Sequence, residues 1–373
     1  MEETAIAMVF EKEASPFVVQ KFNFPELNEG EVLVKTEFAT ICTSDLHTYY
    51  GRRTSPCHSI LGHEIIGHVD KIAANGVKDF AGNLLKEGDR VTWAVYAHDA
   101  ESEMSKKGFP QKSESLYKYG HQKIDGNCQL NGGFASHCHL LKGSSIFKIP
   151  ANLSAEEAAP LNCTHATIAG AIRIAGNLKG KTVLVSGAGM LGLSACTMAK
   201  ECGANTVLVA DIQQARMEMA LSFGAEYFLN ENEFITTKSK EFKGEIDVII
   251  ETSGQPKAIE NTLEKLTTGG IIILVGAVFP QRNISINAEQ IVRKLLTIKG
   301  LHNYIPEDLK NAIQFLSKSK DKYPFKNLVG KTFPLNQLDA AFAEGNIGKH
   351  YRIGIETKSL ITNKSKTNGI ERD

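Results

Sequence analysis

Two cysteines and one histidine supply the ligand types of a metal site. Cys42 opens the segment Cys-Thr-Ser-Asp-Leu-His, His63 precedes a glutamate, and Cys163 lies in the segment Pro-Leu-Asn-Cys-Thr-His. Two thiolates and an imidazole suit zinc, and three protein ligands leave a fourth position for water or a substrate. Zinc at such a site acts as a Lewis acid on an alcohol or carbonyl oxygen. The spacing matches no zinc finger, so on spacing alone two buried apolar cysteines are the more common case.

A glycine-rich turn begins where a short apolar strand is expected to end. The strand is Thr182–Ser186, and the residues after it read Gly-Ala-Gly-Met-Leu-Gly. In a dinucleotide-binding turn the first glycine permits the tight turn, the second lets the backbone approach a pyrophosphate, and the third lets helix and strand pack closely. The residues predicted to bind a dinucleotide in this way are Gly187, Gly189, Met190, Leu191 and Gly192.

An acidic residue, Asp211, follows the next expected strand, Thr206–Ala210. An acid at this place accepts hydrogen bonds from the adenosine ribose hydroxyls and repels a 2′-phosphate, so it favours NAD over NADP. The plain alternative is a surface aspartate that caps the following helix. The strand before the glycine turn and the helix after it favour the nucleotide interpretation.

Two sequence patterns divide the chain. Up to about residue 160, short alternating apolar segments such as residues 90–95 predict an antiparallel, barrel-like unit. From Lys181 onward apolar strands alternate with helical stretches, which is typical of a parallel sheet. We therefore expect an α/β protein with a catalytic domain formed by residues 1–164 and 302–373 and a nucleotide domain formed by residues 165–301. The polar segment 358–373 is expected to be disordered.

The composition argues against several classes of function. Lysine plus arginine and aspartate plus glutamate each number 42, and this balance gives no reason to expect nucleic acid or an anionic membrane as a partner. No apolar stretch approaches the ~20 residues that span a bilayer. The N-terminus does not resemble a signal peptide, and the seven cysteines are an odd number. Both features predict a cytoplasmic protein with reduced thiols.

Taken in order, these motifs resemble the zinc-containing medium-chain dehydrogenases, the family of liver-type alcohol, sorbitol and threonine dehydrogenases. The resemblance runs from about Glu26 to about Ile355 and includes residues 61–64, 88–91, 132–135 and 348–352. It implies a GroES-like catalytic domain of β-barrel type and a Rossmann domain that binds NAD. It also implies hydride transfer between a small alcohol or carbonyl substrate and NAD, in a protein that forms a homodimer or homotetramer.

The resemblance assigns roles around the metal. Cys42, His63 and Cys163 become the ligands of a catalytic zinc. Glu64 becomes a nearby carboxylate that can approach the metal during ligand exchange. Asp45 is expected to hold the far nitrogen of His63 and so to fix its tautomer.

Further roles concern the proton and the cofactor. By the same resemblance Ser44 takes the proton of the substrate hydroxyl, and His47 passes it to solvent. Arg216 matches a basic residue near the adenosine ribose. Arg352 matches an arginine that pairs with the pyrophosphate.

The segment 97–131 departs from the family. Many relatives carry four cysteines there that bind a structural zinc, whereas this chain has Asp99, Ser102, Ser105 and Ser113 at those positions. Carboxylate and hydroxyl groups are a poor set for a soft metal, so we expect one catalytic zinc per chain and no structural zinc. The alternative second site would draw on a different group of residues, namely Cys128, His137, Cys138 and His139.

Two adjacent arginines, Arg52 and Arg53, lie in a loop that borders the substrate entrance in this family. They are candidate ligands for an anionic substrate, and with residues 118–121 they resemble a subgroup proposed to act in phosphonate catabolism. The expected substrate classes are therefore a hydroxyalkylphosphonate or a polyol. Solvated loop charges are the alternative.

Two other functions remain open for the whole chain. One is a zinc-free quinone or enone reductase of the same superfamily, although such relatives generally lack the three metal ligands. The other is a non-catalytic protein that keeps the fold. Retention of Ser44, His47 and Asp211 argues against the second.

Overall fold

The computed structural model describes residues 3–126, 128–230, 233–236 and 240–357. These residues form two compact units: the first runs to Cys163 and resumes at Phe325, and the second spans Thr164–Pro324. The segment 358–373, predicted to be disordered, lies outside the described residues. Among those that are described, no helix combines the length and the apolarity needed to cross a bilayer.

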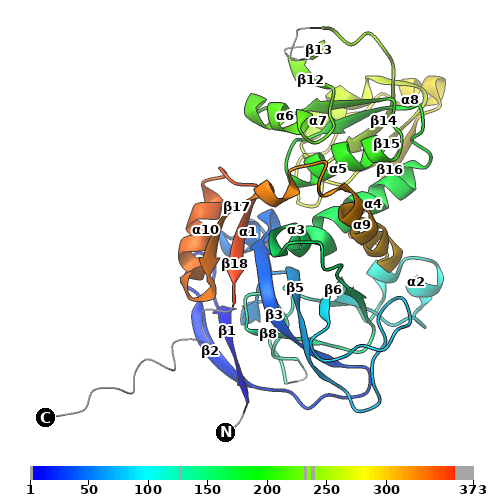
Figure 1. The fold of residues 1–373 in the computed structure, drawn as a ribbon. Coiled ribbons are helices and arrows are strands. Elements are labelled where there is room, and N and C mark those ends of the chain that lie inside the picture. The colour runs from blue at the N-terminus through cyan, green and yellow to red at the C-terminus, as the bar shows by residue number, and fades with distance from the viewer. Residues whose placement is uncertain (1–2, 127, 231–232, 237–239, 358–373) are drawn as a thin grey trace, which may run out of the picture. The chain divides into compact units, whose positions relative to one another are not determined.

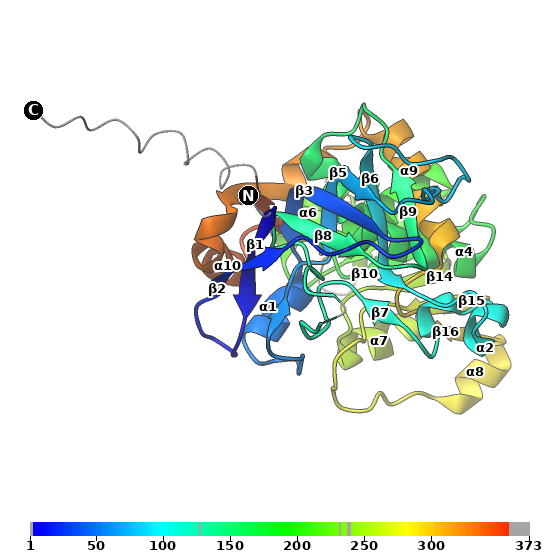
Figure 2. The same ribbon diagram turned by 90° about the horizontal axis from the view of Figure 1, so that it is seen from below.

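The first unit is built around a mixed sheet that joins distant parts of the chain. Its strands are β3 (Val32–Ile41), β5 (Glu64–Ile72), β6 (Arg90–Ala97), β7 (Tyr117–Lys118), β8 (His137–Leu140), β9 (Ser144–Lys148), β17 (Val329–Pro334) and β18 (Arg352–Glu356). They run in the order β17-β18-β3-β5-β6-β7, while β8 pairs with β3 and β9 with β6. Figure 1 shows the C-terminal β18 beside the N-terminal β3, and Figure 2 shows β8 along β3.

A smaller antiparallel sheet and short helices complete this unit. The sheet has the order β2-β1-β4, formed by β1 (Thr4–Phe10), β2 (Val18–Asn23) and β4 (Ser59–Ile60). The helices are α1 (Thr43–Tyr49), α2 (Glu103–Lys106), α3 (Ala155–Ala158) and α10 (Leu338–Asn346), with the 3₁₀ turns η1 (Pro110–Lys112), η2 (Ala159–Asn162), η3 (Phe325–Leu328) and η4 (Leu335–Gln337). The antiparallel, barrel-like pairing that the sequence predicts is confirmed for β3, β5 and β6.

The second unit is an open sheet whose inner strands are parallel. The order is β13-β12-β11-β10-β14-β15-β16, from β10 (Thr182–Ser186), β11 (Thr206–Ala210), β12 (Tyr227–Asn230), β13 (Glu233–Ile235), β14 (Ile246–Glu251), β15 (Leu266–Leu274) and β16 (Thr297–Gly300). Its helices are α4 (Thr164–Ala175), α5 (Met190–Glu201), α6 (Gln214–Leu221), α7 (Pro256–Leu263), α8 (Ala288–Lys294) and α9 (Pro306–Ser319). The apolar strands β10 and β11 are buried because helices cover the sheet, as predicted.

The boundary after the nucleotide domain differs from the expected one. The sequence predicts a return to the catalytic domain at residue 302, whereas the second unit extends to Pro324. The reason is α9, which packs on α4 and places the fully buried Asp308 against Arg173, with Oδ1–Nε and Oδ2–Nη2 distances of 2.7 and 2.9 Å. Gly170 permits this approach, since a Cβ there would lie 2.9 Å from Asp308 Oδ2.

Candidate functional site

Strand register brings together residues that lie far apart in the sequence. In the antiparallel pair β3–β5, Thr40 is opposite Glu64, and Cys42 follows directly after β3. In the pair β18–β3, Ile353 is opposite Ile41, so Arg352 lies beside Cys42. One end of three paired strands therefore carries a thiol, a carboxylate and a guanidinium.

Cys163 reaches the same place by a different route. It follows the 3₁₀ turn η2, which packs on β5 and β6. Asn162 fixes the turn there, because its buried Nδ2 donates to the carbonyl oxygens of His63, at 2.9 Å, and Trp93, at 3.0 Å. The position of the second thiol thus depends on a side-chain amide that the sequence analysis did not single out.

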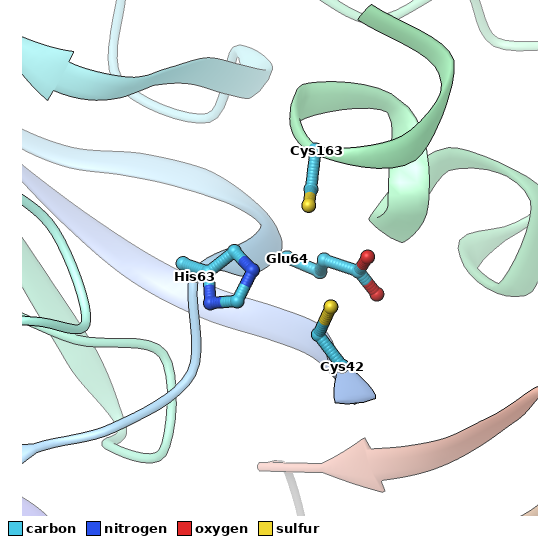
Figure 3. Close-up of side chains that lie close together, drawn as sticks. All are labelled: Cys42, His63, Glu64 and Cys163. Carbon is cyan, nitrogen blue, oxygen red and sulfur yellow. The ribbon is translucent and has the colours of Figure 1, made fainter. Parts of the chain in front are cut away.

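The three predicted ligands and Glu64 form one cluster. Cys42, His63, Glu64 and Cys163 each offer a ligand atom, and these atoms lie within 4.8 Å of one another (Figure 3). Cys42, His63 and Glu64 are buried. Two sulfurs and an imidazole nitrogen at this separation fit the zinc ligand set predicted from the sequence. In the part of the chain that the structure describes, this is the one group of its kind.

Asp45 contacts His63 as the resemblance implies. Its Oδ1 lies 3.3 Å from His63 Nδ1, and the carboxylate also accepts from the backbone N–H groups of Cys42, at 2.8 Å, and Gly62, at 3.3 Å. Burial acts to lower the pKa of His63, but Asp45 and Cys42 raise it well above its usual range. The carboxylate therefore orients the ring so that Nε2 faces the cluster and Ser44 Oγ, 3.5 Å away.

Arg352 lies at this cluster, where it forms a bidentate ion pair with Glu64. Its Nε and Nη2 donate to the two carboxylate oxygens, each at 2.7 Å, and Thr40 Oγ1 donates to Oε2 at 2.5 Å. Both charged residues are buried. Burial raises the pKa of Glu64 and Arg352 opposes that rise. The predicted contact between Arg352 and a pyrophosphate stays a prediction.

The two thiols interact with each other. A hydrogen bond from Cys163 holds the pKa of Cys42 well below its ordinary value, although burial opposes the shift. Arg352 acts in the same direction, since its Nη2 lies 3.5 Å from Cys42 Sγ. Cys42 is therefore disposed to be a thiolate, which is the form that binds metal.

Ser44 and His47 both lie on α1, next to the cluster. Cys42 caps this helix, so Ser44 falls in its first turn and His47 one turn later. His47 is half-buried. Its pKa is lowered mainly by burial and to a lesser extent by the positive charge of Arg52. Its carbonyl oxygen accepts from the backbone N–H of Arg52 at 2.8 Å and of Arg53 at 3.1 Å. The helix thus connects the predicted proton relay to the arginine loop.

The two adjacent arginines have different surroundings. Arg52 is exposed, and its Nη2 donates to Asn346 at 2.7 Å while its guanidinium lies 5.4 Å from the centre of the Tyr50 ring. Arg53 is half-buried, and its Nη1 lies 3.1 Å from Nε2 of His121. The His121 ring in turn lies 4.9 Å from the ring of His63, edge to face. The His121 ring therefore contacts both Arg53 and the predicted metal ligand His63.

The segment 97–131 holds its four altered positions by hydrogen bonds. Ser102 caps α2, and its hydroxyl donates to Ser105 Oγ at 2.9 Å. Ser105 Oγ donates to the carbonyl of Asp99 at 2.6 Å, and Ser113 Oγ lies 3.5 Å from Ser115 Oγ. The alternative group does not converge either, because His139 pairs with Glu31 at 3.0 Å. The absence of a structural zinc stays a prediction.

The glycine turn in the second unit has the expected form. Gly187 has a φ of +97°, and a Cβ there would lie 2.8 Å from Thr252 Oγ1. A Cβ on Gly192 would lie 1.8 Å from the carbonyl oxygen of Gly187, so helix α5 can approach the turn only through a glycine. Gly189 caps α5, and a Cβ there would meet nothing within 4 Å. Met190 and Leu191 begin α5, whose free N–H groups suit a phosphate.

Asp211 lies beside this turn, at the carboxyl end of β11. Its Oδ2 accepts from the N–H of Ala188 at 2.7 Å, and its Oδ1 accepts from the N–H of Gln213 at 2.9 Å. It thus both contacts the glycine turn and supports the start of α6, on which Arg216 lies. Their contacts with a cofactor stay predictions.

Known proteins resemble both units. Residues 28–151 match the model of the alcohol dehydrogenase GroES-like domain, and residues 191–318 match the model of the zinc-binding dehydrogenase domain. An alcohol dehydrogenase of Geobacillus stearothermophilus is 30% identical over 321 residues, 85% of this chain and 90% of that protein. A sorbitol dehydrogenase of Halalkalibacterium halodurans is 30% identical over 337 residues, 87% of this chain and 91% of that protein.

A solved structure agrees with these relatives. The alcohol dehydrogenase of Thermotoga maritima superimposes with a TM-score of 0.87 at 26% identity, covering 95% of this chain and 99% of that one. The predicted GroES-like and Rossmann architecture is thereby confirmed. With the metal cluster and the glycine turn in place, the chain belongs to the zinc-containing medium-chain dehydrogenases, the family of alcohol, sorbitol and threonine dehydrogenases.

Proposed function

We propose that this protein is an NAD-dependent alcohol dehydrogenase with one catalytic zinc per chain. The observation that carries the proposal is the cluster of Cys42, His63, Glu64 and Cys163, which brings the ligand types of a catalytic zinc within 4.8 Å of one another. Cys42, His63 and Cys163 would hold the metal. Zinc, when bound, supplies a Lewis acid that makes loss of the alcohol proton accessible near neutral pH.

The residues around the cluster support proton transfer. Ser44 Oγ lies 3.5 Å from His63 Nε2, so a hydroxyl near this metal ligand would be within reach of the substrate proton. His47 lies one turn further along α1, and burial keeps its pKa low, so it is a neutral acceptor at physiological pH. Ser44 and His47 then form a general-base path from the substrate oxygen toward solvent.

The glycine turn and the start of α5 would hold a nicotinamide dinucleotide, which would supply the hydride acceptor for alcohol oxidation. Asp211 is the reason to propose NAD over NADP, because its carboxylate stands at the end of β11 beside the glycine turn. A 2′-phosphate there would face a negative charge. A zinc-free quinone or enone reductase is the second candidate, and the cluster of metal ligands argues against it.

One experiment tests the proposal in the wild-type protein. Zinc per chain is measured by elemental analysis, and alcohol-dependent reduction of NAD and of NADP is followed by absorbance. We expect one zinc per chain, NAD-linked oxidation, and loss of that activity after chelation, restored by zinc. Two zinc ions per chain would refute the single-site proposal. Activity with NADPH and a quinone that survives chelation would move the protein to the zinc-free reductases.

A further inference from the structure

A group of cations gathers beside the metal cluster. Arg53, Lys112 and Lys118 come from two separate segments, and the charges that act on the Lys118 amine are those of Arg53 and Lys112. Lys118 is the last residue of the short strand β7, next to the turn that carries His121. Like charges repel, so their proximity disfavours the charged form of Lys118, and an anion bound nearby would favour it.

The residues that the structure describes supply no carboxylate partner to Arg53 or to Lys118. Both are half-buried, and among the described residues neither is ion-paired with a carboxylate. Burial, together with Arg53 and Lys112, lowers the pKa of Lys118 to about 8. Partly desolvated cations without a counter-ion are unfavourable in the free protein. They become favourable when an anion binds between them.

His121 holds Arg53 in place against the metal cluster. Nδ1 of His121 lies 3.2 Å from the carbonyl oxygen of Tyr119 and must donate to it, so Nε2 carries the lone pair that accepts from Arg53. The ring is pressed against His63 because Gly120 lets the chain approach: a Cβ on Gly120 would lie 2.6 Å from the carbonyl oxygen of Gly62. Through the His121 ring, Arg53 is thus held close to His63, a predicted metal ligand.

We propose that Arg53 and Lys118 form a subsite for a negatively charged group of the substrate, and that Arg52 takes no part in it. The ligand chemistry is an oxyanion, a carboxylate or a phosphonate, joined by a few carbons to the alcohol that is oxidised. Arg52 is excluded because it is exposed and bound to Asn346. This subsite names a substrate class for the proposed dehydrogenase and rests on that function.

The test compares charged and neutral alcohols of similar size. The substrates are 4-hydroxybutanoate, 3-hydroxypropylphosphonate and the neutral 4-hydroxybutanamide, assayed with wild type, Arg53→Gln and Lys118→Met. We expect each variant to lose about tenfold to a hundredfold in kcat/KM for an anionic alcohol, mainly through KM, because a charge-assisted hydrogen bond is lost. The amide is expected to change by less than about twofold, since it carries no charge.

Two control variants sharpen the comparison. Lys106→Met removes a lysine of the same segment that is exposed and paired with Glu101, and Arg52→Gln removes the neighbouring arginine. Both are expected to keep the preference for anionic over neutral alcohols. Loss of that preference in Arg52→Gln, but not in Arg53→Gln, would overturn the choice of arginine. Equal losses for charged and neutral alcohols in Arg53→Gln and Lys118→Met would overturn the subsite.

A binding measurement separates the subsite from the reaction. Propylphosphonate has no hydroxyl to oxidise, so its binding by calorimetry reports on the subsite alone. Binding that weakens about tenfold or more in Lys118→Met supports the subsite even if no alcohol is oxidised, in which case only the proposed function fails. Oxidation of neutral alcohols with no binding of propylphosphonate would overturn the subsite and leave the dehydrogenase intact. A preference between the carboxylate and the phosphonate identifies the oxyanion.

Discussion

The metal cluster and the segment 97–131 lie in the same unit, but their polar side chains find partners in different ways. At the cluster, two thiols, an imidazole and a carboxylate from separate segments converge within 4.8 Å in a buried place. In the segment, Asp99, Ser102 and Ser105 bond to one another within a few residues of chain. A cation would stabilise the groups that converge at the cluster. In the segment, the polar groups form hydrogen bonds with their neighbours in the chain.

This contrast shows how a segment without thiol ligands can keep its shape through local hydrogen bonds. A thiolate without a metal or a cationic neighbour is unfavourable when buried, so Arg352 stabilises the cluster and a bound cation would stabilise it further. A serine hydroxyl is both donor and acceptor, so three polar side chains in a short turn can close their own hydrogen bonds. The segment keeps helix α2 by capping it with Ser102.

The largest expected effect comes from removing a ligand. Cys163→Ser is expected to lose its zinc and at least about 10³-fold of kcat/KM, because zinc contributes several kcal/mol of transition-state stabilisation. Zinc content and NAD-linked oxidation measure this. Cys57→Ser, which changes an exposed thiol outside the cluster, is the matched control and should keep both. Full zinc and activity in Cys163→Ser would mean that the cluster is not the metal site.

The next effect concerns the buried ion pair. Arg352→Met leaves Glu64 buried without its bidentate partner, so the metal-free protein is expected to lose about 3 kcal/mol of unfolding free energy. Urea unfolding measures the loss. The double variant Arg352→Met with Glu64→Gln should recover part of it, since the uncompensated carboxylate is then gone. If the losses of unfolding free energy in the two single variants simply add in the double variant, the two side chains do not stabilise one another.

Replacing Asp45 should have a smaller effect, seen in the affinity for the metal. Asp45→Asn keeps the shape but weakens the contact with His63 Nδ1, and zinc affinity is expected to fall about 10–100-fold. Competition with a chromophoric chelator measures the affinity. An unchanged affinity would show that the backbone contacts of Asp45, to Cys42 and Gly62, are its whole role.

The sequence predicts best what is local in the chain. The strands Thr182–Ser186 and Thr206–Ala210 and the turn at Gly187 are confirmed as expected, because each is a contiguous pattern of apolar residues and glycines. The type of fold followed from the same patterns. The ligands Cys42, His63 and Cys163 could be named only by resemblance, since long spacings carry no geometric signal.

Long-range pairings were beyond the sequence. Nothing local to Arg352 indicates that strand register will place it against Glu64, and the resemblance assigned it to a phosphate instead. The contact of His121 with His63 depends on the approach of two loops at Gly120. The domain boundary was misplaced because α9 is an amphipathic helix whose partner, α4, cannot be read from its own sequence.

The smallest expected effect tests the other side of the comparison. Ser105→Ala removes the hydroxyl that links Ser102 to the carbonyl of Asp99, and we expect a loss of about 1 kcal/mol in unfolding free energy. Zinc per chain should not change, because the segment holds its shape by hydrogen bonds and no metal is involved. Ser115→Ala, further along the same segment, is the control, since its hydroxyl makes a single long contact of 3.5 Å, with Ser113, among the described residues. A fall in zinc content in Ser105→Ala would show that the segment also binds a metal. The segment and the cluster would then differ only in the chemistry of their metal ligands.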